Sequence, residues 1–211
     1  MPKKKESAPL TWEYELKYGE NKTVCGVDEA GRGPLVGRVY AAAVIIPKEL
    51  CEHPTVLSLN DSKMLSEKKR FLLADEIKAL GIPYCVAFSE VEEIERINIL
   101  EASLLAMRRA IDGLDVKPDV ALIDGNIERD FQLEAHAVIG GDGLSPSIAA
   151  ASILAKTERD KYCLEYLDAT YPEYGFAAHK GYGTKAHYEA LEKYGPCPEH
   201  RMSFLKKFYA K

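Results

Sequence analysis

The order of apolar segments predicts an α/β domain with a mixed β-sheet flanked by helices. Near the start of the chain, two short runs rich in Val, Ile and Ala are separated only by a glycine-containing turn, which favours antiparallel pairing. Later apolar runs alternate with segments of helical period, which favours parallel pairing. The 211 residues suffice for one domain with a sizeable core. We therefore expect a single domain over 1–211, with 1–20 as an N-terminal extension and 195–211 as a basic C-terminal tail.

Strands are expected where short apolar runs are bounded by turn residues. They cover 24–28, 36–46, 82–88, 120–123 and 135–139. The turn after the first run contains Gly31, Gly33 and Pro34, and proline has no amide donor for a β-ladder. Pro47 closes the second run. We expect the first two strands to pair as a hairpin.

Helices are expected where apolar residues recur every three or four positions. They cover 66–80, 100–114, 147–167 and 185–193. Ser66 can cap the first helix, although Lys69 stands where a capping box would have Glu, and Gly81 ends it. The second ends near Gly113, and its Leu and Met stripe is typical of a core-facing helix. The third is Ala-rich, and Gly195 with the following prolines breaks the fourth.

The composition is that of an ordinary globular protein, with 46% apolar and 29% charged residues. No apolar run approaches the ~20 residues that span a bilayer. The basic start of the chain, with Lys3 to Lys5, is not followed by an apolar signal segment, so we expect a solvated end there. These features predict a cytoplasmic protein.

Neither the cysteines nor the net charge decides the function. The five cysteines are odd in number and lack a C-x-x-C spacing, so we expect reduced thiols that pack as small apolar groups. The formal net charge of −5 argues at first against a nucleic-acid partner. However, an acidic cluster that binds cations reverses its own field. A nucleic-acid substrate therefore stays open.

Four acidic side chains stand at or just after the ends of predicted strands, namely Asp28, Glu29, Asp124 and Asp142. Sites in open α/β sheets gather beyond the carboxyl ends of neighbouring strands. Acids held close together raise each other's pKa and oppose folding unless cations join them. Carboxylate oxygens suit Mg²⁺ or Mn²⁺, whereas zinc favours His or Cys. The pattern therefore indicates a site for a hard cation.

The same acids also have a purely structural interpretation, which the pattern leaves open. An Asp at a strand end before Gly, as at Asp124, is commonly a turn residue. Asp28 and Glu29 are neighbours on a strand, so their side chains face opposite sides of the sheet unless the strand breaks at Glu29 or Glu29 acts through a water. Three histidines are expected to be exposed polar groups rather than metal ligands, namely His179, His187 and His200.

The acids lie within seven short blocks that can be compared with known families. The first is Val27-Asp-Glu-Ala-Gly-Arg-Gly-Pro34. The others are Asn60-Asp-Ser-Lys63, Asp124-Gly-Asn126, Gly141-Asp142, Ala149-Ala-Ala-Ser-Ile-Leu-Ala-Lys156, His179-Lys-Gly-Tyr-Gly-Thr184, and His200-Arg201 with Ser203-Phe204. In content and order these blocks resemble the type 2 ribonucleases H, the ribonuclease HII family, over about residues 22–205. One departure is Pro146, which is tolerated because it stands at a helix start.

The resemblance implies an RNase H-like fold with a mixed five-stranded sheet and a divalent-metal-dependent endoribonuclease. Such an enzyme cuts the RNA strand of RNA/DNA hybrids, or a lone ribonucleotide within duplex DNA, and leaves 5′-phosphate and 3′-hydroxyl ends. Its four catalytic and metal-binding carboxylates carry over to Asp28, Glu29, Asp124 and Asp142. Two Mg²⁺ or Mn²⁺ ions ~4 Å apart would act there, with Asp28 bridging them and Glu29 acting directly or through a water.

The resemblance also implies residues that bind the substrate. Backbone groups of Gly31, Arg32 and Gly33 would read the 2′-hydroxyl that distinguishes RNA from DNA. The phosphate contacts would be Lys63, Lys156, Lys180 and Arg201. The tyrosine that packs on the sugar would be Tyr182. Without the resemblance, these would be an ordinary turn, surface cations and one of 12 tyrosines. Ser152 in the Ala-rich helix would lie beside the site or, more simply, be a packing residue.

The blocks also separate this chain from other proteins of the same fold. A DNA-strand-transfer or junction-cutting enzyme would share clustered carboxylates but lack the Gly31-Arg-Gly33 and Tyr182 blocks. A non-catalytic duplex-binding module would have lost some of the acids. Type 3 enzymes lack the arginine in that turn and carry an extra N-terminal domain, for which the roughly twenty residues before the first strand leave no room. We expect a monomer, and the sequence indicates no protein partner.

Overall fold

A computed structural model describes residues 10–210 of the chain. Its strands are β1 (Val24–Ala30), β2 (Val39–Val44), β3 (Tyr84–Ser89), β4 (Val120–Asp124) and β5 (Glu134–Val138). Its helices are α1 (Glu13–Tyr18), α2 (Pro54–Leu57), α3 (Glu67–Ala79), α4 (Val91–Asp112), α5 (Pro146–Tyr162), α6 (Asp168–Thr170), α7 (Phe176–His179), α8 (Lys185–Tyr194) and α9 (Met202–Tyr209). The expected mixed sheet flanked by helices is confirmed.

The five strands form one sheet in the order β3-β2-β1-β4-β5. The first three strands pair antiparallel, which confirms the predicted hairpin, while β4 joins β1 and β5 joins β4 in parallel. Strand β1 is therefore central, and Val27 on it pairs with Ala43 on one side and Ile123 on the other. The parallel pairing places the end of β4, at Asp124, beside Asp28 on β1.

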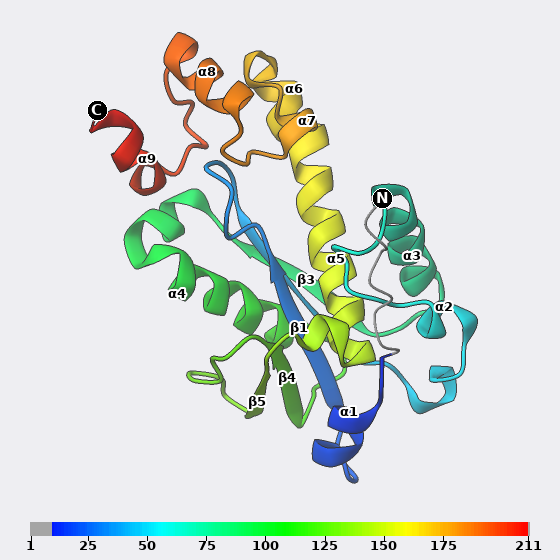
Figure 1. Cartoon of the computed structure of the whole chain (residues 1–211). Helices are drawn as coiled ribbons and strands as arrows, with labels where there is room; N and C mark the ends of the chain where they lie inside the picture. Colours follow the sequence, from blue (N-terminus) through cyan, green and yellow to red (C-terminus); the bar gives the residue numbers. More distant parts are fainter. Residues whose placement is uncertain (1–9, 211) are drawn as a thin grey trace.

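Helices cover both faces of the sheet, with α4 on one side and α5 with α3 on the other (Figure 1). Strand β2 is buried along its whole length, because a strand covered on both faces carries an almost continuous apolar run. Helix α5 approaches β1 very closely, since a Cβ on Gly26 would lie 2.2 Å from the carbonyl carbon of Ser147. The glycine thereby sets the position of α5 against the strand that carries Asp28.

The helix caps follow the sequence closely, and one helix departs from its expected bounds. The Ser66 hydroxyl accepts a hydrogen bond from the Lys69 amide at the start of α3. Helix α5 has Ser145 as its cap, and Pro146 occupies the first turn as expected. Helix α4 begins nine residues before the apolar stripe that predicted it, and its backbone is interrupted at Asn98, where φ is 68° and ψ is 166°.

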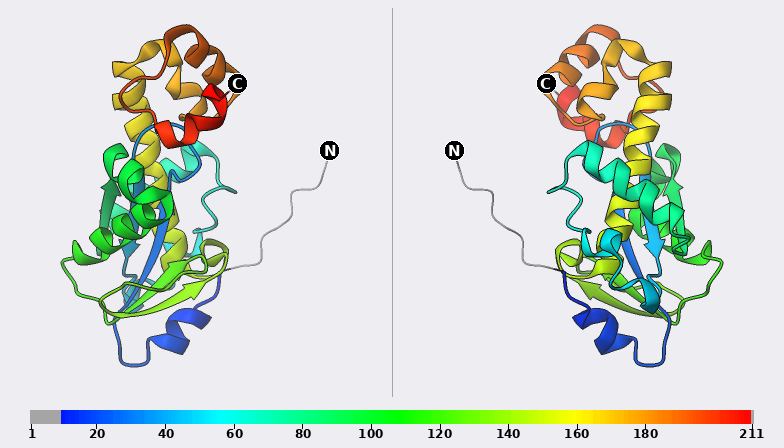
Figure 2. Two further views of the ribbon diagram at one scale, coloured as in Figure 1. Left: turned by 90° about the vertical axis from the view of Figure 1, so that its left-hand side faces the viewer. Right: turned by 90° about the vertical axis from the view of Figure 1, so that its right-hand side faces the viewer.

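The first and last helices of the described chain lie at opposite poles of the molecule. Helix α1 is at one pole, and helices α6 to α9 gather at the other (Figure 2). The segment 195–211, expected as a tail, contains α9 and the buried side chains of Arg201 and Leu205. The segment 1–20 contains α1, whereas Lys3 to Lys5 lie outside the described residues.

Two further expectations concern the cysteines and the membrane. All five cysteines are free thiols, as expected, and Cys25, Cys163 and Cys197 are buried. Over residues 10–210, no helix combines the length and the apolar character needed to cross a bilayer.

Candidate active site

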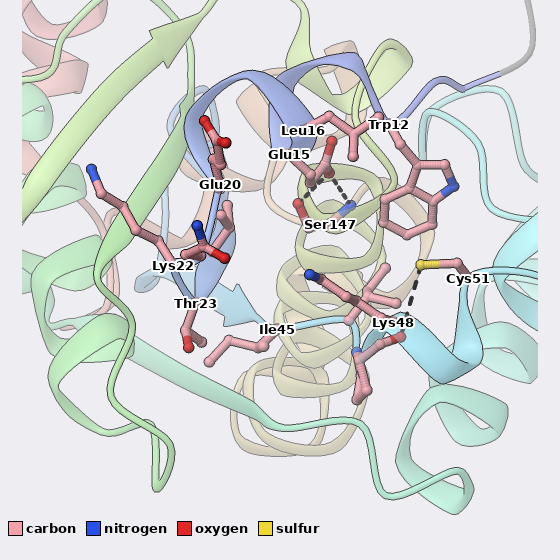
Figure 3. Close-up of a pocket in the computed structure, with 15 residues that line it drawn as sticks. Trp12, Glu15, Leu16, Glu20, Lys22, Thr23, Ile45, Lys48, Cys51 and Ser147 are labelled. Carbon is pink, nitrogen blue, oxygen red and sulfur yellow. Dashed lines mark hydrogen bonds between the residues drawn. The ribbon is translucent and has the colours of Figure 1, made fainter.

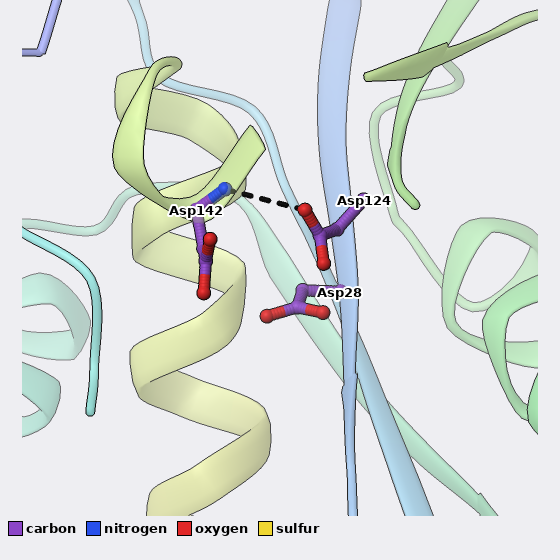
Figure 4. A group of neighbouring side chains, drawn as sticks. All are labelled: Asp28, Asp124 and Asp142. Carbon is purple, nitrogen blue, oxygen red and sulfur yellow. Dashed lines mark hydrogen bonds between the residues drawn. The ribbon is translucent and has the colours of Figure 1, made fainter. Parts of the chain in front are cut away.

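Strand pairing brings Asp28 and Asp124 together on one face of the sheet. Val27 pairs with Ile123 in parallel, so the next residue on each strand points to the same side. Asp142 reaches the same place from the 3₁₀ turn Gly141–Gly143, which follows β5 through Gly140 in the left-handed conformation, with φ of 67°. One oxygen from each carboxylate lies within 4.8 Å of the others. The close-up shows the three side chains gathered beside β1 and the start of α5 (Figure 4).

The three carboxylates form a charge cluster that burial makes unfavourable. Burial raises the pKa of Asp28 well above its ordinary value, and the negative charges of Glu29 and Asp124 raise it further. Burial also raises the pKa of Asp124, with a further contribution from Asp142. Two contacts oppose these shifts at Asp28, which accepts hydrogen bonds from the Glu29 amide, at 2.7 Å, and from the Ser152 hydroxyl. The arrangement therefore favours binding of a cation.

Glu29 lies next to this cluster but does not belong to the three-carboxylate group. It is still paired with Ala41 in β1, so its side chain starts on the face opposite to Asp28, as the alternation rule requires. Arg32 donates to its carboxylate at 3.3 Å. Burial raises the pKa of Glu29, Arg32 lowers it, and Asp124 raises it again, so the carboxylate interacts electrostatically with the cluster.

The Asn60–Lys63 block packs directly on the cluster. Lys63 donates through Nζ to Oδ2 of Asp142 at 2.9 Å, and its side chain is 75% exposed. Ser62 is buried, and its hydroxyl lies 2.8 Å from that of Ser152, which in turn contacts Asp28. Of the two alternatives for Ser152, the structure thus favours the place beside the site. Ser62 is a supporting residue that the sequence reasoning missed. The signal was its place between Asp61 and Lys63 in a family block.

A largely buried ion cluster holds the Asn60–Lys63 block in place. The sequence reasoning missed this cluster too. Arg70 on α3 donates to the carbonyl of Ser62 and to Oδ2 of Asp160, both at 3.0 Å. Lys156 donates to the other oxygen of Asp160 at 2.6 Å. Burial lowers the pKa of Lys156. The ammonium expected to contact a phosphate is therefore already paired, although the i,i+4 spacing of Lys156 and Asp160 could have revealed the pair.

Arg201 holds the Gly31-Arg32-Gly33 turn in place. This role differs from the phosphate contact that we expected of Arg201. Arg201 is fully buried, so its guanidinium is not open to a phosphate. Its nitrogens donate to the backbone carbonyls of Gly31, Arg32, Pro34, Gly37 and Arg38, at 2.7–3.1 Å. We therefore assign Arg201 to positioning the turn, in which Gly31 has a φ of 103°.

Tyr182 lies against this turn. A Cβ on Gly33 would be 3.3 Å from Cε1 of Tyr182, and the tyrosine is 44% exposed. The buried guanidinium of Arg159 lies 5.8 Å from the centre of the same ring. Lys180 points elsewhere, since its Nζ donates to the Ala177 carbonyl at 2.6 Å and its side chain is only 14% exposed. The structure thus brings Gly33 and Tyr182 together, while Lys180 is largely occupied.

The expectation that the histidines are exposed is wrong for His187 and His200. Both are buried, and their Nε2 atoms lie 3.0 Å apart. Burial lowers the pKa of each to about 4. His179 is half-buried and stacks on His187 with ring centres 4.7 Å apart. Their polar sequence context gave no sign of burial, because it depends on the packing of α8 against the C-terminal segment.

A separate pocket of about 610 Å³ lies next to α1 (Figure 3). Its lining includes Trp12 before α1, Leu16 on α1, Lys48 after β2, and Ser147, and none of the four predicted carboxylates. In its wall, Glu15 accepts hydrogen bonds from the hydroxyls of Ser145 and Ser147, both at 2.6 Å. Glu15 thereby joins α1 to the start of α5, outside the candidate active site.

The sheet topology and the acidic cluster at the ends of β1 and β4 define a nuclease of the RNase H fold with a candidate metal site. The family model for Ribonuclease HII matches residues 25–207. A curated Ribonuclease HII from Albidiferax ferrireducens is 54% identical over 181 residues, which cover 86% of this chain and 85% of that protein. The chain belongs to the ribonuclease HII family.

Solved structures agree with this assignment. The ribonuclease H2 from Pyrococcus horikoshii superposes with a TM-score of 0.71 and 25% identity, covering 90% of this chain and 99% of that one. Bst-RNase HIII, solved in complex with Mn²⁺, shares the fold with a TM-score of 0.62 and 20% identity, covering 82% of this chain and 63% of that one. The chain is thus a ribonuclease H, an endonuclease that hydrolyses RNA in RNA/DNA hybrids, rather than a DNA-processing enzyme or a non-catalytic module.

Proposed function

We propose that this ribonuclease H also cuts at ribonucleotides embedded in duplex DNA, and that it cleaves at the cluster of Asp28, Asp124 and Asp142. The observation that carries the proposal is the convergence of these carboxylates within 4.8 Å, with Asp28 on the strand that leads into the Gly31–Gly33 turn. Attack of water on the phosphorus would leave 5′-phosphate and 3′-hydroxyl ends.

The cofactor we propose is Mg²⁺ or Mn²⁺, with two ions present during catalysis. The all-oxygen donor set suits such hard cations. The raised pKa of buried Asp28 supports the same choice, because a cation would relieve the repulsion among the acids. When bound, a pair of such ions stabilises the attacking and leaving oxygens of an in-line displacement. Asp28 would bridge the ions, Asp124 and Asp142 would complete their ligand sets, and Glu29 would act directly or through a water.

The neighbouring residues would orient these carboxylates and guide the substrate. Ser152 and the Glu29 amide hold one orientation of the Asp28 carboxylate through their hydrogen bonds. Lys63 is the best placed of the expected phosphate contacts, because its side chain is exposed and its ammonium, paired with Asp142, lies at the edge of the cluster. Lys156 and Lys180 would reach a phosphate only by exchanging their present partners.

Recognition of the ribonucleotide would rest on the Gly31-Arg32-Gly33 turn and Tyr182. Glycine lets the backbone approach a ligand closely, and the 2′-hydroxyl can both donate and accept a hydrogen bond. The exposed ring of Tyr182 next to Gly33 offers a flat surface for the neighbouring sugar. Arg201 and the carbonyls it binds would keep the turn in place.

The test is cleavage of three labelled duplexes that carry one ribonucleotide, several or none, with Mg²⁺, Mn²⁺ or chelator. We expect cuts in the two ribonucleotide-containing duplexes with either metal and none with chelator. Cleavage of the all-DNA duplex at the same rate would contradict the proposal.

A second test concerns the acids. Asp124→Asn should abolish cleavage while duplex binding is largely retained, because only one ligand charge is lost. The matched control is Asp115→Asn, which changes an exposed acid after α4 and should leave the rate unaltered. Activity of Asp124→Asn near that of the unmodified protein would remove Asp124 from the site.

A further inference from the structure

A buried chain of hydrogen bonds connects Tyr182 to the C-terminal segment. The Tyr182 carbonyl lies 2.9 Å from Nδ1 of His187. Nε2 of His187 lies 3.0 Å from Nε2 of His200. The chain ends at Nδ1 of His200, which lies 2.9 Å from the amide nitrogen of Cys197.

The two ends of this chain fix the protonation of both rings. A carbonyl can only accept, so Nδ1 of His187 must carry the hydrogen and donate to Tyr182. An amide N–H can only donate, so Nδ1 of His200 must accept from Cys197. His200 therefore carries its hydrogen on Nε2 and donates to the bare Nε2 of His187. Only one pair of neutral tautomers satisfies every contact.

The surroundings of the pair keep both rings neutral. Phe176 packs edge-on against His187, and His179 stacks on it with ring centres 4.7 Å apart. Tyr174 lies 5.1 Å from His200 between ring centres, and the Cys197 sulfur lies 3.1 Å from Nδ1 of His200. These neighbours carry no carboxylate, and burial lowers the pKa of each histidine to about 4.

The far end of the chain is the segment that holds the glycine turn. His200 forms a β-bridge with Val36 and precedes Arg201, which binds the turn carbonyls. The Leu35 amide in turn donates to the Gly181 carbonyl at 2.9 Å, next to Tyr182. The glycine turn, the Tyr182 loop and the segment 197–201 are thereby joined into one closed network.

We propose that His187 and His200 are positioning residues for ribonucleotide recognition, acting through the Tyr182 backbone to fix the Tyr182 ring against the Gly33 turn. This inference rests on the proposed function, in which the turn and Tyr182 read the ribonucleotide. The hydrogen bond from His187 to the Tyr182 carbonyl links the pair directly to the loop that carries the Tyr182 ring.

The test compares affinities for a duplex with one ribonucleotide and for its all-DNA counterpart, in an Asp124→Asn background that prevents cleavage. His187→Gln can still accept from His200 but cannot reach Tyr182, so the ratio of the two affinities should fall, by up to about tenfold for one lost hydrogen bond. His136→Gln, on β5, is the matched control and should preserve the ratio. An unchanged ratio in folded His187→Gln would overturn the inference.

A measurement without any histidine substitution covers the case in which His187→Gln does not fold. Nitrogen-15 NMR of the Asp124→Asn protein should show the two imidazoles as opposite neutral tautomers. The ribonucleotide-containing duplex should shift the His187 signals more than the all-DNA duplex does. Identical tautomers, or equal shifts with both duplexes, would overturn the inference.

Tyr182→Ala in the same assay separates this inference from the proposed function. If Tyr182→Ala leaves the affinity ratio unchanged, Tyr182 does not read the ribonucleotide and that part of the proposed function fails. If Tyr182→Ala lowers the ratio and His187→Gln does not, only the role of the histidines fails.

Discussion

The ionised carboxylate of Asp28 lowers the stability of the folded, metal-free protein. It is buried on the central strand, and burial together with Glu29 and Asp124 raises its pKa. An ionised carboxylate in this position costs free energy, which a bound cation would recover. Arg201 is the opposite case, a buried charge satisfied by backbone carbonyls and used to hold a turn.

Asp28→Asn should therefore raise the free energy of unfolding of the metal-free protein while it abolishes cleavage. The raised pKa means that the folded state takes up a proton more readily than the unfolded chain. This stabilising contribution is present at low pH and is lost as pH rises through the folded pKa, so the gain from Asn should be largest at high pH. Urea unfolding at several pH values checks this, and a variant that is less stable than the parent at every pH would contradict it.

Arg201→Lys should destabilise the protein by about 3 kcal/mol, because one ammonium cannot replace a planar fork that binds several carbonyls. Arg32→Lys is the control, since the Arg32 side chain is 50% exposed and its ion pair contributes little. Urea unfolding of both variants measures the difference. Equal stabilities would show that the five carbonyl contacts of Arg201 do not hold the turn.

At the scale of elements, the close contact between β1 and α5 determines where the site forms. Gly26 lets α5 lie directly on the strand, and this places Ser152 beside Asp28. The parallel pairing of β1 with β4 then aligns Asp28 with Asp124. The acids are thus brought together by register and packing rather than by proximity in the chain.

Gly26→Ala tests this contact. Its Cβ would lie 2.2 Å from backbone of α5, so the helix must move, and we expect a loss of about 3 kcal/mol of stability together with reduced activity. Gly143→Ala is the control, because a Cβ there meets nothing within 4 Å. Thermal unfolding and the duplex assay measure both effects, and a fully active, equally stable Gly26→Ala protein would refute this account of the packing.

The histidine pair predicts how the C-terminal elements respond to acid. The pKa of each is about 4 in the fold against 6.5 normally, so the unfolded chain binds more protons between these values. Stability should therefore fall as pH drops from 6.5 to 4, by on the order of a few kcal/mol, and this contribution levels off below pH 4. Replacing both histidines by Gln should remove that part of the pH dependence, whereas an unchanged profile would contradict it.

The sequence predicted those features that depend on local pattern and strand order. The strand ends predicted Asp28 and Asp124 together, and the alternation rule anticipated that Glu29 would start on the other face. The burial of His187 and Arg201 was missed, because it arises where segments distant in the chain close over the glycine turn. His187 lies on α8 and Arg201 directly precedes α9, and a polar side chain at either position does not by itself distinguish burial from exposure.

For the whole molecule, the two poles support different parts of the candidate site. The pole with α1 fixes the start of α5 through Glu15, and the pole with α6 to α9 holds the glycine turn and Tyr182 (Figure 2). The acidic cluster lies on the sheet between them, at the ends of β1 and β4. In the proposed function, the chemistry and the recognition of the ribonucleotide would thus depend on separate elements that meet at β1.

The most direct test of the central claim is Mn²⁺ anomalous scattering from crystals of the protein with a ribonucleotide-containing duplex. We expect manganese bound by Asp28, Asp124 and Asp142, facing the phosphate next to the ribonucleotide, and loss of this signal in Asp124→Asn. Manganese bound elsewhere, or a signal at the cluster that Asp124→Asn leaves unchanged, would contradict it.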